Sequence, residues 1–345
     1  MNPISAWNRF LFGPISARPL GVFRIVFGLL LLVYLAVMSV EFDYWYTGAG
    51  LLQGSEAREA AGPYRLSPLN YIQDPTIARL FWAVTVAAAV GVTLGWRTRF
   101  MNVLLYLGML SLYHRNVTAN GGPDCVPMLV CFYLMLCPCG AAFSLDAIRA
   151  AKKRGTPAEP LIAPWGLRLL QMQICLLYFQ SCVIKCDGAT WMNGTVVHYV
   201  LFNREFGMFN MEWLAQYPLL INFLTHGALL IEFALAFWLW FRPTRRWTIL
   251  AGVALHAGIR PILNVPGFGE TLIATYLVFL APDEINAVIR FLDPRVWLAR
   301  LGVRTPSLAF WGRLDRPAGL QGLHQLEFPF EVAEVQTGAE AITAG

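Results

Sequence analysis

Charged residues are scarce in this sequence. Asp, Glu, Lys and Arg make up 14% of the 345 residues, whereas 57% are hydrophobic, and an average soluble chain is about 25% charged. A water-soluble fold of this size needs more charge to cover its surface. The composition therefore excludes an ordinary cytosolic enzyme and a disordered chain, and it indicates that the bilayer is the main solvent.

Lysine is nearly absent. Of the 26 basic residues, 23 are arginine, and the lysines are Lys152, Lys153 and Lys185. The net charge of +5 comes from short basic clusters between apolar runs, a pattern typical of membrane loops and not of a nucleic-acid-binding surface. One lysine, Lys185, ends an apolar run.

Metal-binding cysteine patterns are also missing. The seven cysteines include no paired CxxC spacing, so the sequence predicts no metal site. Most lie in apolar runs, where a free cysteine behaves as a small packing residue. The sequence does not decide whether Cys125 forms a disulfide with Cys182 or Cys186.

Eight apolar runs approach the roughly 20 residues that span a bilayer. We expect an all-α polytopic bundle of about eight transmembrane helices over residues 1–282, followed by a partly loose tail over 283–345 that begins with an amphipathic stretch at 285–304. The first run is too long for a cleavable signal. The runs cover 20–40, 77–96, 100–114, 125–143, 165–185, 217–241, 246–264 and 267–282.

The basic clusters fall in every second connection. They precede the first run and fill the second-to-third, fourth-to-fifth and sixth-to-seventh links, and another follows the eighth run. The positive-inside rule therefore predicts that both termini are cytoplasmic. The loops at 41–76 and 186–216 would then be external, with Lys185 at the outer end of its helix.

Lys185 is the first candidate catalytic residue. An end-anchor could equally be arginine, which this chain prefers, whereas only lysine becomes a neutral amine base when burial lowers its pKa. The alternative interpretation is a lysine that only anchors the helix end at the interface. Asp187 follows two residues later and would pair with Lys185 or Arg204, or simply begin the loop.

Further ionisable residues lie within apolar runs, where they usually serve a function or pair with one another. We expect Glu232 to pair with Arg24 or His256. Arg24 is expected to be structural. His256 either hydrogen-bonds a quinol, shuttles a proton or is a satisfied core histidine. His226 is six residues from Glu232 and forms no helical metal pair with it.

Several short motifs follow one another in a familiar order. They are Arg24-x-x-x-Gly28, Asn120-Gly-Gly-Pro-Asp124, Ser144-Leu-Asp146, Tyr178-Phe with Lys185-Cys-Asp187 and Trp191, Gly194, Thr225-His226-Gly with Glu232, and His256. By their order and spacing the chain resembles the horizontally transferred transmembrane (HTTM) domain family, bacterial relatives of vitamin K-dependent gamma-carboxylase. The likeness spans roughly residues 15–282.

The resemblance implies a chemistry. In the carboxylase a lysine deprotonates vitamin K hydroquinone, oxygen adds, the resulting base removes a proton from a peptide glutamate, and carbon dioxide captures the carbanion. Lys185, His256 and Asp187 correspond to catalytic positions. Residues Asn120, Asp124, Trp191, His226 and Glu232 would line the site for a reduced vitamin K or menaquinone-type quinol. The resemblance also implies a bacterial cytoplasmic membrane, lipids as neighbours and a peptide substrate.

The sequence departs from the carboxylase in two places. Gly-Gly-Pro-Asp stands where the family has a histidine before the fourth helix, and about 60 residues follow position 282 where the carboxylase has a large lumenal domain. Quinol chemistry on another substrate is therefore the expectation that the sequence supports better than glutamate carboxylation.

Three hypotheses follow. The protein is a quinol-dependent oxygenase or carboxylase that uses Lys185, a transporter with a buried Arg24, Glu232 and His256 path, or an assembly factor for peptide export. For an enzyme, Lys185→Arg should fail as badly as Lys185→Ala, because arginine keeps the charge but is no base. For a transporter, Glu232→Gln should impair function more than the Lys185 substitutions do.

Overall fold

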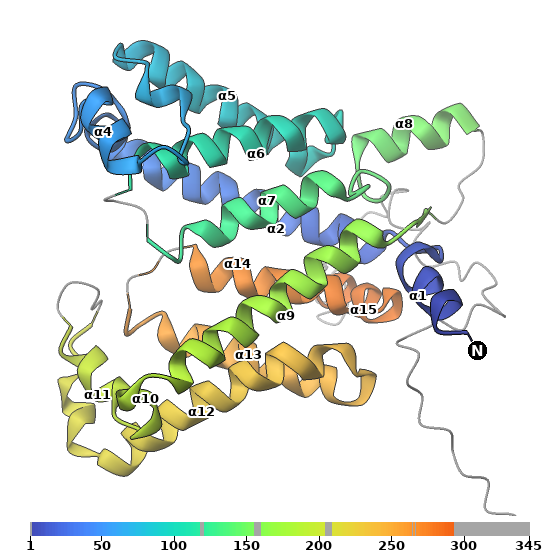
Figure 1. Cartoon of the computed structure of the whole chain (residues 1–345). Helices are drawn as coiled ribbons and strands as arrows, with labels where there is room; N and C mark the ends of the chain where they lie inside the picture. Colours follow the sequence, from blue (N-terminus) through green and yellow to red (C-terminus); the bar gives the residue numbers. More distant parts are fainter. Residues whose placement is uncertain are drawn as a thin grey trace, which may run out of the picture.

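The fold is a bundle of helices (Figure 1). The computed structural model describes residues 2–117, 121–154, 160–203, 209–263, 265 and 267–292. Eight helices in this part of the chain correspond to the eight apolar runs. They are α2 (Arg18–Met38), α5 (Pro75–Leu94), α6 (Thr98–Arg115), α7 (Cys125–Leu136), α9 (Trp165–Cys186), α12 (Pro218–Phe237), α13 (Arg242–Ile259) and α14 (Phe268–Thr275).

Two of the predicted ends are wrong. The fourth run was expected to reach residue 143, but α7 ends at Leu136, just before Cys137 and Pro138. The seventh run was expected to reach 264, but α13 ends at Ile259, two residues before Pro261. In both cases proline disfavours a helical residue before it and removes a backbone donor.

Four helical segments within the described residues are long and apolar enough to cross a membrane: Arg18–Tyr46, Pro75–Leu94, Trp165–Cys186 and Pro218–Trp240. Two further apolar helices are shorter, Cys125–Leu136 and Phe268–Phe279. Large apolar side chains also point outward, including Leu219 at 87% exposure and Phe223 at 71%. So much exposed apolar surface suits contact with lipid.

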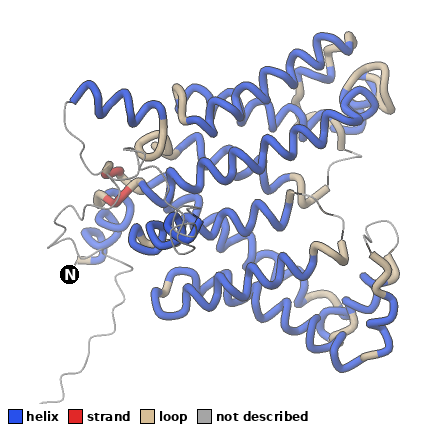
Figure 2. Tube along the Cα trace, turned by 180° about the vertical axis from the view of Figure 1, so that it is seen from behind, coloured by secondary structure: helices blue, strands red, loops and turns tan. Residues whose placement is uncertain are grey.

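The basic connections gather at one end of the bundle. The α5–α6 turn, the α12–α13 turn and the helix α8 (Leu145–Arg154) lie at the same end as the N-terminus (Figure 1). The segment before α2 also lies there, with α1 (Pro3–Phe12) and a two-stranded sheet of β1 (Ile15–Ser16) and β2 (Leu161–Ile162), visible in Figure 2. This arrangement agrees with the alternation of charge along the sequence.

Short helices were not predicted in the two loops expected to be external. The 41–76 segment contains α3 (Phe42–Tyr46), α4 (Gly54–Ala61) and η2 (Pro68–Asn70) after η1 (Ser39–Glu41), and the 186–216 segment contains α10 (Ala189–Met192), α11 (Val196–Leu201) and η3 (Glu212–Gln216). They lie at the end opposite the N-terminus (Figure 1). The remaining short elements are η4 (Trp238–Trp240) and η5 (Tyr276–Phe279).

The amphipathic stretch expected at 285–304 begins as α15 (Pro282–Leu292). Ile285 is fully buried and Asn286 accepts a hydrogen bond from Arg18 at 3.1 Å, which ties α15 to α2. Glu284 accepts from Arg246 at 2.8 Å. The rest of that stretch and the tail expected to be loose lie outside the described residues.

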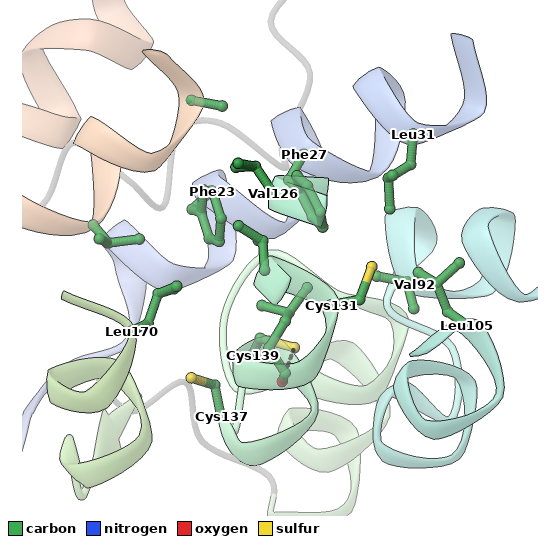
Figure 3. Packing of buried hydrophobic residues seen from close by; sticks show 14 of the residues in the cluster. Phe23, Phe27, Leu31, Val92, Leu105, Val126, Cys131, Cys137, Cys139 and Leu170 are labelled. Carbon is green, nitrogen blue, oxygen red and sulfur yellow. Dashed lines mark hydrogen bonds between the residues drawn. The ribbon is translucent and has the colours of Figure 1, made fainter. Parts of the chain in front are cut away.

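The core is centred on α2, whose Phe23 and Phe27 are fully buried and pack with residues of α5, α6, α7 and α9 (Figure 3). All seven cysteines are free thiols, so the disulfide left open by the sequence is not formed. Cys131, Cys137 and Cys139 are buried in this core, as expected of small packing residues.

Arg24 is fully buried and donates to four backbone carbonyls. It reaches Cys139 at 3.1 Å, Thr93 at 2.6 Å and Phe143 at 2.6 Å, and it also bonds Val92. A planar guanidinium group suits such divergent acceptors. Arg24 thereby joins α2 to the end of α5 and to the turn after α7. Its expected pairing with Glu232 is wrong.

The same junction contains Asp146. Its carboxylate accepts from the Arg97 and Thr98 amides at 3.0 and 2.7 Å and from the Thr98 hydroxyl at 2.6 Å, so it caps α6. Burial alone would raise the pKa of Asp146, but these hydrogen bonds outweigh burial and lower it. Because the pKa is lowered, the stabilisation is present at neutral pH and is lost as the pH falls through the folded-state pKa.

Arg24→Lys should lower stability in detergent by about 3 kcal/mol, because one ammonium cannot reach the four carbonyls that the guanidinium binds. Thermal unfolding of the purified protein measures the change. Arg99→Lys is the matched control, since Arg99 is exposed on the same end, and it should stay within about 0.5 kcal/mol of wild type. Equal melting temperatures for the two variants would contradict the structural role of Arg24.

Candidate functional site

The partner of Lys185 is Glu232. The ammonium lies at the last turn of α9 and forms an ion pair with the carboxylate of α12. The two side chains are 20% and 9% exposed. Ser181, one turn earlier on α9, donates to the other oxygen of Glu232 at 3.0 Å. The expectation that Glu232 pairs with Arg24 or His256 is therefore wrong, because α12 packs against α9.

The position of Lys185 on its helix explains these contacts. Residues 178, 181 and 185 are spaced by three and four, so they share one face of α9. That face meets α12, where Cys182 also approaches the Leu229 carbonyl at 3.9 Å. A lysine at the end of an apolar helix is thus held inside the protein and does not simply extend to the interface.

Trp191 covers the Lys185 ammonium. Its ring centroid lies 4.6 Å from Nζ, a distance typical of a cation–π contact. The chain turns back after α9 because the Gly188 amide bonds the Lys185 carbonyl at 3.0 Å and α10 follows at once. Asp187 is the exposed C-cap residue of α9. Arg204, its other expected partner, lies outside the described residues.

His256 lies in a second, connected group of polar side chains. Its Nε2 is 2.8 Å from the Tyr178 hydroxyl, which is 2.6 Å from the Tyr276 hydroxyl. All three side chains are buried. They come from α13, α9 and η5, and Tyr178 lies two turns before Lys185 on the same face of α9. The two groups therefore form one polar strip inside an apolar bundle.

A glycine permits this approach of α13. A Cβ added at Gly252 would lie 2.6 Å from the Tyr276 hydroxyl oxygen and 2.9 Å from a methyl carbon of Leu235. Only a residue without a side chain leaves room for Tyr276 at this position of the helix.

Sequence reasoning missed the roles of Ser181, Tyr178 and Tyr276. The first two could have been found, because they lie four and seven residues before Lys185 on an otherwise apolar helix. Tyr276 gave no such signal, because it belongs to a different run and only the packing of η5 against α9 brings it to Tyr178.

Other predicted site residues make their contacts outside the polar strip. Asp124 accepts from Tyr34 of α2 at 3.2 Å and from the Gly121 amide at 2.8 Å. His226 contacts Asn222 at 3.1 Å and the Met192 carbonyl at 3.3 Å, which ties α12 to α10. Asn120 lies outside the described residues. Among the residues that the structure describes, no three His, Cys, Asp or Glu side chains gather as a metal site would require.

The ion pair makes a prediction about stability. Lys185→Met and Glu232→Leu should each cost roughly 3 kcal/mol, because each leaves one charge without its partner in an apolar environment. The double variant should be close to wild type. Thermal unfolding in detergent of the four proteins gives the coupling energy. Additive losses in the double variant would show that Lys185 is an anchor that does not depend on Glu232.

Comparison with known proteins agrees with this architecture. The HTTM domain family matches residues 12–283. The chain is also 24% identical over 227 residues to the uncharacterized protein YitO of Bacillus subtilis (strain 168), which covers 63% of this chain and 72% of that protein. No solved structure matches the chain. The match over most of the chain, together with its apolar helices, shows that this is a membrane protein that belongs to the HTTM domain family.

Proposed function

We propose that this protein is a quinol-dependent membrane oxygenase, related in chemistry to the gamma-carboxylase, in which Lys185 takes a proton from the quinol. The observation that carries the proposal is the Lys185–Glu232 ion pair inside the apolar bundle. The Lys185 and Glu232 side chains are only 20% and 9% exposed, so bulk water competes little for the pair, and the neutral amine form of the lysine is a base.

The charge of the pair suits this role. Lys185 and Glu232 share one acidic proton, either as ammonium and carboxylate or as amine and carboxylic acid, and both forms are neutral overall. Uptake of one further proton gives the pair a single positive charge. That charge lies next to the quinol anion that has just formed, where a low dielectric strengthens the attraction. Ser181 keeps the Glu232 carboxylate oriented throughout.

A lipid-soluble quinol fits the surroundings. Trp191 provides an aromatic face beside the ammonium. A small apolar recess between α7, α9 and α14 is lined by residues that include Val130, Leu177 and Thr275. Leu177 and Thr275 directly precede the two tyrosines of the polar strip, so apolar surface lies beside Tyr178. Tyr178 and His256 then serve as the route for the second proton.

The quinol supplies four electrons to dioxygen, two as it becomes quinone and two from the ring double bond that becomes the epoxide, and its two protons end in the water. The proposed overall reaction converts quinol and dioxygen into quinone epoxide and water, with one oxygen atom in the ring and the other in the water. The chain's residues hold and move protons in this scheme. No acceptor peptide is needed for the atoms to balance.

We further propose that all eight helices cross a bacterial cytoplasmic membrane with both termini in the cytoplasm. This orientation is supported by the basic connections, which lie together at the same end of the bundle as the N-terminus (Figure 1). Lys185, at the opposite end of α9, then lies near the outer leaflet. A quinol would reach it from within the membrane.

Oxygen uptake by the detergent-purified protein with reduced menaquinone or vitamin K hydroquinone tests the proposal. Wild type should consume oxygen. Lys185→Ala and Lys185→Arg should both lose at least about a hundredfold in rate, because neither provides an amine base. Lys152→Ala is the matched control, since that exposed lysine lies on α8 at the other end.

Two outcomes would overturn the proposal. One is no wild-type uptake above the detergent blank. The other is equal rates for wild type and both Lys185 variants. Mass spectrometry of the extracted quinone should detect the epoxide in wild type and in Lys152→Ala.

A further inference from the structure

Two buried polar atoms without a hydrogen-bond partner belong to residues on either side of the α13–α14 connection. Within the described part of the chain, His256 Nδ1 and Glu270 Oε2 are among the few buried side-chain atoms that lack one. A buried polar group left unpaired costs about 1–3 kcal/mol. Two such atoms, one on an imidazole and one on a carboxylate, are chemically complementary.

The backbone brings these residues together. His256 is one turn from the end of α13, and Glu270 is in the first turn of α14. A Cβ added at Gly269, the neighbour of Glu270, would lie 3.4 Å from the Cβ of His256. The Phe268 ring packs edge-on against the imidazole with centroids 6.0 Å apart. The Glu270 carboxylate is also close enough to interact electrostatically with the imidazole.

The hydrogen bonds of the polar strip leave one question of direction. With Nδ1 protonated, His256 Nε2 accepts from Tyr178, and Tyr178 accepts from Tyr276. With Nε2 protonated, the direction of both bonds reverses. The distances of 2.8 and 2.6 Å suit either arrangement. In a neutral imidazole, the hydrogen bond that one ring nitrogen makes decides whether the other nitrogen carries the proton.

We propose that Glu270 is a positioning residue that holds His256 in the Nδ1–H tautomer through one bridging water. The water accepts from His256 Nδ1 and donates to Glu270 Oε2, so both orphaned atoms are satisfied. This inference deepens the proposed function and takes from it only the membership of His256 in the site.

The other oxygen of Glu270 explains why this carboxylate keeps its orientation. Oε1 accepts from Arg260 Nε at 3.1 Å, and both side chains are more than a third exposed. The Glu270 carboxylate therefore has one oxygen bound to Arg260 near the surface and one oxygen buried. With His256 Nε2 fixed as an acceptor, the Tyr178 hydroxyl has a base ready to receive its proton. Both hydrogen bonds of the strip then point toward His256, which receives the first proton that passes along it.

Nitrogen NMR of the full-length protein in detergent, labelled with ¹⁵N in the histidine rings, tests this assignment. The chain has five histidines, and the His256→Gln spectrum identifies the signals of His256. We expect a protonated-type signal for Nδ1 and an unprotonated-type signal for Nε2. In Glu270→Leu the Nε2–H form should become a major species, whereas Glu270→Gln, which keeps an acceptor oxygen, should retain the wild-type tautomer.

Arg260→Gln is the matched control, because it removes the ion pair and leaves the Glu270 carboxylate. It should keep the Nδ1–H form. Unchanged signals from the other four histidines would show that each variant is folded. An Nε2–H tautomer in wild type, or an unaltered tautomer in folded Glu270→Leu, would overturn the inference.

The tautomer is read without quinol, so the two proposals fail separately. A protein that consumes no oxygen but switches tautomer in Glu270→Leu loses the proposed function and keeps this one. Where uptake is observed, Glu270→Leu should reduce its rate by roughly ten- to a hundredfold, as loss of an orienting hydrogen bond does at comparable sites. Glu270→Gln should restore most of it.

Discussion

The absence of water around a buried charge is the constraint on which this structure depends. An ionised group in a bilayer must be satisfied by the protein, and this chain does so in two ways. Arg24 binds four carbonyls at the basic end of the bundle, and no carboxylate of the described residues forms an ion pair with it. Lys185 and Glu232 neutralise each other at the opposite end. The first arrangement ties α2 to the ends of its neighbours, and the second joins α9 to α12.

The helices could be predicted from the sequence, and their ends and partners could not. Apolar runs locate helices because spanning the bilayer requires about 20 such residues. Pro138 and Pro261 decided where α7 and α13 end, against runs of hydropathy that continue past them. The small helices of the two loops at the end opposite the N-terminus were missed because their polar sequences show no strong periodicity.

Some residues of the candidate site could be recognised from the sequence. Lys185 stood out because the chain otherwise uses arginine, and His256 and Glu232 because ionisable residues are costly in apolar segments. The choice of partner for Glu232 was wrong because hydropathy and spacing along one helix do not say which helix packs beside it. The contact between α9 and α12 is a property of the three-dimensional packing, and so is the meeting of Tyr178 with Tyr276.

The Lys185–Glu232 pair also affects how the protein is made. α9 leaves the ribosome well before α12, so Lys185 enters the membrane while its partner is still unsynthesised. Until α12 is made, a lysine at a helix end can extend its ammonium to the membrane interface. Glu232 is in the interior of α12, where an unpaired carboxylate is costly, so its contact with Lys185 favours docking of α12 against α9. The ion pair therefore forms only after α12 has been synthesised, which makes it a late event in the assembly of the bundle.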